Sequence, residues 1–143
     1  MKLTKTTVKR KSKRKSPADL FFDVSDEMKQ WSWLLADEVA SWPRVTRKRF
    51  FGNISLYRSD VIFASVPEKK ALFAPNNVIF RLLEVTPKLR AQIDADPKVN
   101  SSHQTSKNWF GYTVSSPQDL RGALEWFQIA YDQVVERRVA KRR

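Results

Sequence analysis

The chain has 143 residues and a formal net charge of +12 at pH 7, with 41% hydrophobic residues, no cysteine and one histidine, His103. This length fits one domain of roughly 120 residues, and the lack of cysteine excludes disulfides, thiolate zinc sites and thiol nucleophiles. One histidine cannot build a histidine-based metal site, and no apolar run approaches the roughly 18 residues of a membrane span.

The positive charge belongs to the two ends of the chain. Residues 1–16 hold eight Lys/Arg and no acid, and residues 136–143 hold five Lys/Arg and one Glu. Residues 17–135 hold 14 Lys/Arg and 14 Asp/Glu. We therefore expect a neutral body with two cationic ends that attract polyanions.

Residues 1–16 are predicted to be a disordered basic leader, because they contain few apolar residues and no helical stripe. Residues 17–143 then form the single expected domain, ending in a basic helix tail. No apolar signal stretch follows the basic start, so we expect a cytoplasmic protein.

A flexible cationic arm binds nucleic acid without reading its sequence. The alternatives are that the arm binds an anionic membrane surface or that it is only a solubilising tail. The candidate nucleic-acid contacts in the leader are Lys9, Arg10, Lys11, Lys13, Arg14 and Lys15.

The first helix is predicted over Ser25–Ala40. Ser25 is the expected N-cap, and the acids Asp26 and Glu27 suit the positive end of the helix dipole. Pro43 ends the segment, because proline disfavours helix in the residue before it. One apolar face recurs at spacings of three and four residues, and it consists of Met28, Trp31, Leu35 and Val39.

From residue 44 to residue 83 the hydrophobic pattern alternates, which is typical of strands. Ser59 and Asp60 are predicted to form a two-residue hairpin loop, and Pro75–Asn77 is a turn signal. The predicted strands are Val45–Phe51, Asn53–Arg58, Val61–Pro67, Ala71–Ala74 and Val78–Leu83.

The C-terminal part is predicted to contain two helices and one strand. A short helix spans Thr86–Ala95, a polar loop spans Asp96–Lys107 and a strand spans Trp109–Val114. The last helix starts at the sequence Ser116-Pro117-Gln118-Asp119, with Ser116 as its N-cap and proline at the first helical position. Its apolar stripe is Leu120, Leu124, Phe127, Tyr131 and Val134. Together these elements predict an α+β fold, a small antiparallel sheet of about five strands packed by an N-terminal helix and a long C-terminal helix.

A family resemblance runs through the segment Trp42–Pro67. Its motifs are Val45-Thr46, a basic pair, Phe51-Gly52, Leu56-Tyr57 and Ile62-Phe63-Ala64, followed in the C-terminal half by Tyr112, Leu120, Leu124, Trp126 and Ala130. In this order they resemble the TfoX N-terminal domain family of YjbR-like α+β domains, over about Glu27–Val135. The chain departs from the family at Asn53 and Ser55, where glycines are usual. The resemblance implies a small antiparallel sheet with helices packed on it, and it implies no catalytic residue or cofactor; the family is named after a regulator of bacterial competence for DNA uptake.

The strand at residues 45–51 contains the basic run Arg47-Lys48-Arg49. Alternation puts Arg47 and Arg49 on one face, and Lys48 and Phe50 on the other. Arg47 and Arg49 are candidate phosphate contacts, because cations interleaved with aromatic rings suit single-stranded nucleic acid. The interpretation that we favour is a solvated strand face.

Two aromatic features are expected to be structural. The glycine of Phe51-Gly52 permits a bulge or a close backbone approach, which we favour over contact with a ligand. The tryptophans are expected to form core and lid rather than a stacking surface; they are Trp31, Trp33, Trp42, Trp109 and Trp126.

The sequence favours a non-enzymatic binding or regulatory module that binds nucleic acid through its basic tails. It contains no Walker loop, no dinucleotide-binding glycine motif and no nucleophile elbow, so no catalytic residue, cofactor or metal is expected. The alternative is a small ligand-binding or enzymatic domain with a pocket between the sheet and the C-terminal helix. A third possibility is assembly through exposed sheet edges or aromatic patches.

Overall fold

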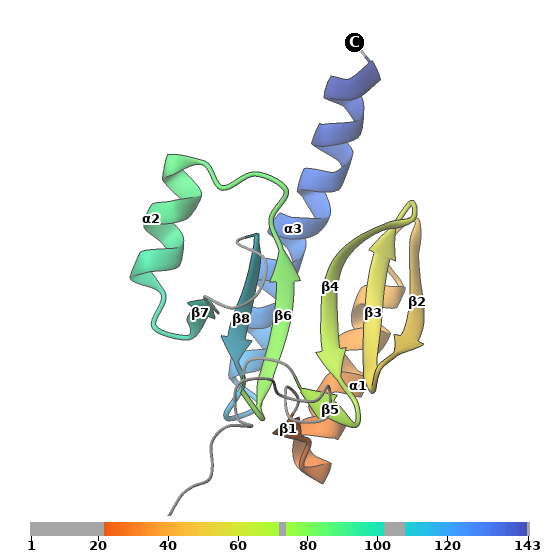
Figure 1. The fold of residues 1–143 in the computed structure, drawn as a ribbon, viewed down its shortest axis with the longest axis vertical. Helices are drawn as coiled ribbons and strands as arrows, with labels where there is room; N and C mark the ends of the chain where they lie inside the picture. The colour runs from red at the N-terminus through yellow and green to blue at the C-terminus, as the bar shows by residue number, and fades with distance from the viewer. Residues whose placement is uncertain (1–21, 72–73, 102–107, 143) are drawn as a thin grey trace, which may run out of the picture.

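The computed structural model describes residues 22–71, 74–101 and 108–142 (Figure 1). The predicted leader, residues 1–16, lies outside the described residues, and so does His103. The elements in chain order are β1 (Phe22–Asp23), α1 (Asp26–Ala40), β2 (Val45–Phe50), β3 (Asn53–Arg58), β4 (Val61–Pro67), β5 (Lys70–Ala71), β6 (Asn77–Arg81), α2 (Pro87–Ala95), β7 (Val99–Ser101), β8 (Trp109–Thr113) and α3 (Asp119–Arg142).

The main sheet is antiparallel throughout, with six strands in the order β2-β3-β4-β6-β8-β7. The short strands β1 and β5 pair with each other in a separate two-stranded sheet. Helices α1 and α3 pack on one face of the main sheet, and α2 lies beyond its β7–β8 side (Figure 1). The expected α+β class, with an N-terminal and a long C-terminal helix on an antiparallel sheet, is confirmed.

Local sequence signals fixed several element boundaries. The Ser25 hydroxyl accepts the amide N–H of Met28 at 3.1 Å, so the predicted N-cap of α1 is confirmed. Strands β3 and β4 have the predicted bounds. Between them, Ser59 and Asp60 have φ values of 47° and 71°. Two positive φ angles define the tight loop that matches the twist of a hairpin, and here it forms without glycine.

The predicted polar loop Asp96–Lys107 is wrong over Val99–Ser101, which is strand β7. Three residues are too few to show an alternating pattern, and the strand exists because β8, later in the chain, offers its edge for pairing. The expected strand Ala71–Ala74 overlaps β5 (Lys70–Ala71) at Ala71, and β5 pairs with β1 outside the main sheet. Residues 72 and 73 of that expected strand lie outside the described residues. The main sheet therefore has six strands instead of about five.

The helix α3 starts two residues later than predicted. The α-helix begins at Asp119, and the residues after Ser116 form a turn that precedes it. The Asp119 carboxylate accepts the N–H groups of Ser115 at 2.7 Å and Ser116 at 3.2 Å. The Asp119 carboxylate thus accepts the N–H of Ser116, the predicted cap residue, as the acid of a capping box does. The helix itself, however, starts at Asp119 and not directly after Ser116.

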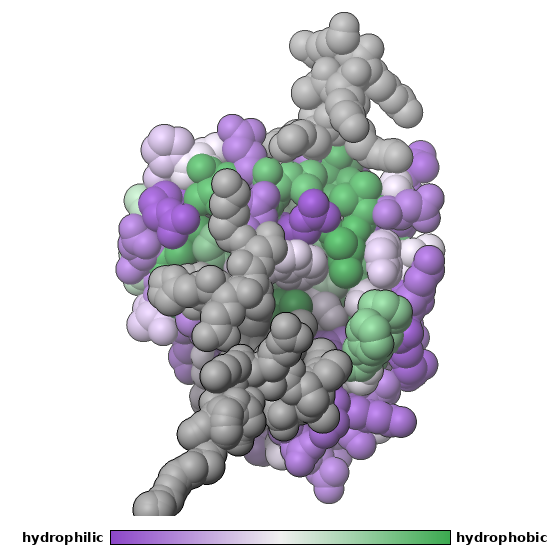
Figure 2. Space-filling model, in the orientation of Figure 1, coloured by the Kyte–Doolittle hydropathy of each residue, from purple (hydrophilic) through white to green (hydrophobic). Residues whose placement is uncertain are grey.

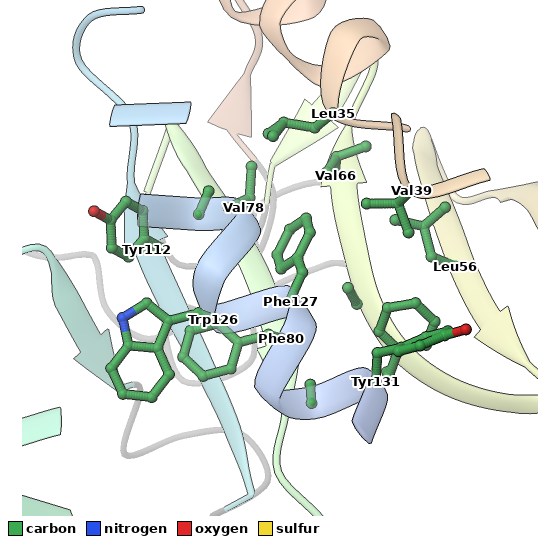
Figure 3. Packing of buried hydrophobic residues seen from close by; sticks show 14 of the residues in the cluster. Leu35, Val39, Leu56, Val66, Val78, Phe80, Tyr112, Trp126, Phe127 and Tyr131 are labelled. Atoms are coloured by element: carbon green, nitrogen blue, oxygen red, sulfur yellow. The ribbon is translucent and has the colours of Figure 1, made fainter. Parts of the chain in front are cut away.

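The core lies between the main sheet and the two long helices. Figure 3 shows Phe127 and Tyr131 projecting from α3 towards the strands, with both side chains buried. Phe80 stacks on Trp126 with ring centroids 5.1 Å apart. Trp31 and Trp126 are core residues as expected, but Trp33 is 43% exposed, so the core-and-lid interpretation is wrong for that side chain.

Candidate nucleic-acid interface

Strand β2 presents Arg47 on the side of the sheet that carries the helices. Arg47 is the cross-strand partner of Leu56, a fully buried core residue, so both side chains share that face. The Arg47 guanidinium donates to the Asp37 carboxylate of α1, with Nη1 2.7 Å from Oδ1. The first predicted phosphate contact on the strand is therefore paired with an acid of the same protein.

Arg49 is paired more tightly than Arg47. Its Nε lies 2.8 Å from Glu68 Oε1 and its Nη2 lies 3.2 Å from Oε2, which is a bidentate arrangement. The indole N–H of Trp33 donates to the same carboxylate at 2.8 Å. The hydrogen bond from Arg49 lowers the pKa of Glu68 against the opposing effect of burial, and the Trp33 bond adds to it. Because a paired arginine has its charge largely balanced, Arg49 attracts a phosphate less strongly than an unpaired cation.

Strand β2 also forms one edge of the main sheet. Five of its six residues are exposed, including the three consecutive cations Arg47, Lys48 and Arg49. Charged side chains on an edge strand oppose pairing with a strand of another molecule. The basic run thus has a structural role that needs no ligand, and it argues against assembly through this edge.

Lys48 lies on the face of the sheet away from α1 and α3. Its cross-strand partner is Ser55, and its Nζ lies 5.2 Å from the centroid of the Tyr57 ring. No ion pair joins Lys48 to any side chain in the described part of the chain. Phe50, two residues along the same strand, is 60% exposed. Figure 2, which views this face, shows hydrophilic side chains interspersed with hydrophobic ones.

Charge is segregated between the sheet and the helix packed on it. The strands of the main sheet contain no Asp or Glu, whereas α1 contains four acids and one lysine. The strands of the main sheet therefore carry positive charges alone and α1 carries a surplus of negative ones, although nine of the 14 Lys and Arg residues of the body lie outside the main sheet. Sorting the charges by predicted element would have found this pattern in the sequence. The cations of the main sheet are Arg47, Lys48, Arg49, Arg58 and Arg81.

The two ends of the described chain lie at opposite ends of the molecule, with β1 at the lower end and the C-terminus of α3 at the upper end of Figure 1. The last buried residue of the described α3 side chains is Val134, and the helix continues to Arg142. This extension of the helix carries Arg137, Arg138, Lys141 and Arg142. The six candidate contacts of the leader, residues 9–11 and 13–15, lie outside the described residues.

The space between the sheet and α3 is filled by side chains. Phe127 and Tyr131 lie there, buried against Phe63 and Phe80, at the place where the alternative function required a pocket. A shallow depression of about 410 Å³ lies elsewhere, between α2 and α3, beside the hydrogen bond from the Trp126 indole to Asp96. Within the described ranges, no three His, Cys, Asp or Glu side chains gather as a metal ion would require.

Comparison with protein-family models, with curated proteins and with solved structures found no match to this chain. Among the helices in the described part of the chain, none combines the length and the apolar character that a bilayer crossing requires. The distribution of charge and of aromatic side chains over this fold is therefore the basis for a functional proposal.

Proposed function

We propose that the chain is a non-enzymatic binding or regulatory module of the TfoX N-terminal-like class that binds nucleic acid non-specifically in the cytoplasm. Its contacts are the basic leader, residues 1–16, and the basic end of α3. The observation that carries the proposal is the separation of charge, since the ends hold the net positive charge and the body, residues 17–135, is neutral.

The fold supports a role for both ends in binding one polyanion. The helix α3 extends eight residues beyond Val134, which is about 12 Å at the rise of an α-helix. The first described residue, Phe22 in β1, lies at the other end of the sheet (Figure 1). A nucleic acid that contacts both ends would run along the strand direction, beside the cations of the main sheet.

The body contributes less binding energy than the ends in this proposal. Arg47 and Arg49 already pair with Asp37 and Glu68, so a phosphate must compete with a carboxylate for each of them. Lys48, which has no acid partner among the described residues, is the better candidate on this strand. Binding energy then comes chiefly from counterion release at the tails, which carries no information about base sequence.

The test is a salt titration of DNA binding by the full chain, by a chain that lacks residues 1–16 and by a chain that lacks residues 137–143. If about five phosphates are neutralised, the slope of log K against log salt is roughly −4 to −5 for the full chain. We expect a shallower slope and weaker binding for each truncated chain.

A full-length chain whose leader Lys and Arg residues are replaced by Gln is the matched control, because it keeps the length and removes the charge. This chain should behave like the one that lacks residues 1–16. Equal affinities and equal slopes for the full chain and both truncated chains would rule out the tail mechanism.

A further inference from the structure

We infer that the turn between β2 and β3 is a base-stacking site, at which Phe50 and Phe51 receive unpaired bases of single-stranded DNA or RNA. This inference rests on the proposed function and names its substrate class. Phe50 and Phe51 are 60% and 71% exposed. Their ring centroids lie 4.2 Å apart, so the two rings form one apolar surface.

The position of this aromatic pair is unusual for a tight turn. Such turns favour Gly, Asn and Asp, because both central residues need a positive φ. Here Gly52, with a φ of 79°, meets that requirement, but Phe51 adopts a φ of 52°. A bulky residue in this region is strained, and its ring gains little burial in return. Folding alone therefore does not account for an aromatic residue at this position.

The turn is held firmly in place by the segment that follows β4. The carbonyl oxygen of Gly52 accepts the N–H groups of Glu68, Lys69 and Lys70 at 2.9, 2.8 and 3.2 Å. The Asn53 amide donates to the carbonyl oxygen of Lys70 at 2.9 Å. A Cβ at Gly52 would lie 3.1 Å from Lys70, so the two backbones approach closely. Rings on a fixed backbone lose little conformational entropy when a base stacks on them.

Cations surround the aromatic pair. Lys48 and Arg49 precede it on β2, and Lys69 and Lys70 belong to the segment that is bonded to the turn. Arg49 pairs with Glu68 and Lys70 with Asp23, whereas Lys48 and Lys69 form no ion pair with another described residue. Exposed rings near exposed lysines such as Lys48 and Lys69 are complementary to a single strand, whose bases and phosphates are both accessible. A duplex hides the faces of its bases and offers this site its phosphates alone.

The same turn lies close to β1, where the described part of the chain begins, and the basic leader ends six residues earlier in the sequence. Lys70, whose N–H bonds to Gly52, is the cross-strand partner of Asp23 in β1, and Ala71 is the partner of Phe22, the first described residue. Figure 1 shows β1, β5 and the β2–β3 turn at the same end of the molecule. A nucleic acid bound by the leader would therefore reach the aromatic pair.

The experiment compares the full chain with its Phe50→Ala/Phe51→Ala variant. The probes are a labelled oligothymidine and a duplex with the same number of phosphates. We expect the variant to bind the single strand about 10- to 100-fold more weakly, as the loss of one or two stacked bases requires. Duplex affinity and the salt slope for both probes should stay unchanged. Leu34→Ala is the matched control, since Leu34 is 59% exposed on the acidic helix α1.

Should the alanine variant lose its cooperative thermal transition, Phe50→Leu/Phe51→Leu gives the same comparison, because it keeps apolar side chains and removes the rings. Equal single-strand affinity of wild type and variant would overturn the stacking site, and leader-dependent binding would still support the proposed function. Absence of binding to both probes by the wild type would overturn both. A dimer in light scattering that the Phe variant abolishes would assign the rings to a second copy and overturn the inference.

Discussion

The guanidinium of Arg58 lies over the ring of Tyr131, with Cζ 3.7 Å from the ring centroid. Its Nη1 donates to the main-chain carbonyl of the same tyrosine at 3.2 Å. The Tyr131 hydroxyl in turn donates to the carbonyl oxygen of Pro43 at 2.7 Å. One tyrosine of α3 thus binds the end of β3 and the loop that precedes β2, residues that lie 73 and 88 positions away in the sequence.

Replacement of Arg58 by methionine should lower the free energy of unfolding by about 1–2 kcal/mol. Methionine keeps an unbranched apolar chain but loses the interaction of the cation with the ring and one hydrogen bond. Part of this loss is offset, because Arg58 Nε is buried with no hydrogen-bond partner among the described residues. Urea denaturation measures the effect, with Lys88→Met as an exposed control; an Arg58→Met variant as stable as that control would contradict the prediction.

Gly122→Ala should destabilise the protein by about 1 kcal/mol, although alanine is the better helix former by a similar amount. A Cβ at this position would overlap the Tyr112 hydroxyl oxygen and lie 2.8 Å from Cζ. Such overpacking costs about 1–3 kcal/mol, so it outweighs helix propensity. Thermal denaturation measures the change. The double variant Gly122→Ala/Tyr112→Phe should regain part of the lost stability, because the hydroxyl is gone. If the stability changes of the two single substitutions simply add up in the double variant, the clash is not the cause.

The contribution of Glu68 to stability should depend on pH. Its folded pKa is lower than its ordinary value of 4.5, chiefly through the bond from Arg49. Because folding lowers this pKa, the ionised carboxylate stabilises the fold at pH values above the pKa of the unfolded chain. This stabilisation is lost as the pH falls through the pKa of the folded protein. At pH 7 the free energy of unfolding of the wild type should exceed that of Glu68→Gln by about 1 kcal/mol. The difference should shrink as the pH drops below 4.5.

Denaturation series across this pH range test the prediction for Glu68. The control is Glu38→Gln, an exposed acid of α1 with no ion pair to another described residue. Its difference from wild type should stay near zero at every pH. A constant offset between wild type and Glu68→Gln down to acid pH would show that the charge of Glu68 is not the cause.

Asp119→Ala should lower the free energy of unfolding by about 1–2 kcal/mol, because it removes the acceptor of the Ser115 and Ser116 N–H groups and the ion pair with Lys98. Burial alone would raise the pKa of Asp119, but the Ser115 N–H, the Lys98 ammonium and the Ser116 N–H outweigh it and lower the pKa. The carboxylate is therefore the form that the fold stabilises. Equilibrium unfolding compares this variant with Asp132→Ala, whose exposed carboxylate bonds to Gln128. Equal free energies of unfolding for the two variants would mean that the bonds of Asp119 to the turn before α3 contribute no net stability.

Lys48→Gln should weaken nucleic-acid binding more than Arg47→Gln. Both residues lie on β2, but Arg47 pairs with Asp37 at 2.7 Å, and Lys48 has no acid partner within the described structure. Loss of one phosphate contact reduces the salt slope by about 1. Salt titrations of both variants should show that reduction for Lys48→Gln. The opposite ranking would mean that Arg47 exchanges Asp37 for a phosphate on binding.

Local sequence signals determined much of the secondary structure. The prediction of Ser25 as a cap was correct because its hydroxyl accepts the N–H three residues later in the chain, within one helical turn, and Thr86 caps α2 in the same way. The prediction of a loop at Ser59-Asp60 was correct because the strands on both sides could be recognised by their alternating pattern. Only these two residues then remained between the strands to reverse the chain. Alternation also separated Arg47 and Arg49 from Lys48, since successive side chains of a strand point to opposite faces.

The sequence by itself determined the division of charge into a basic leader, a neutral body and a basic end, because charge is a sum over residues. Tertiary structure alone decided which charges remain unpaired. Arg49 meets Glu68, 19 residues away, because β2 and the end of β4 both flank β3. Strand β7 likewise needed the edge of β8. These pairings join residues far apart in the chain, and their loop-closure cost is repaid when the whole core packs, so no local pattern contains them.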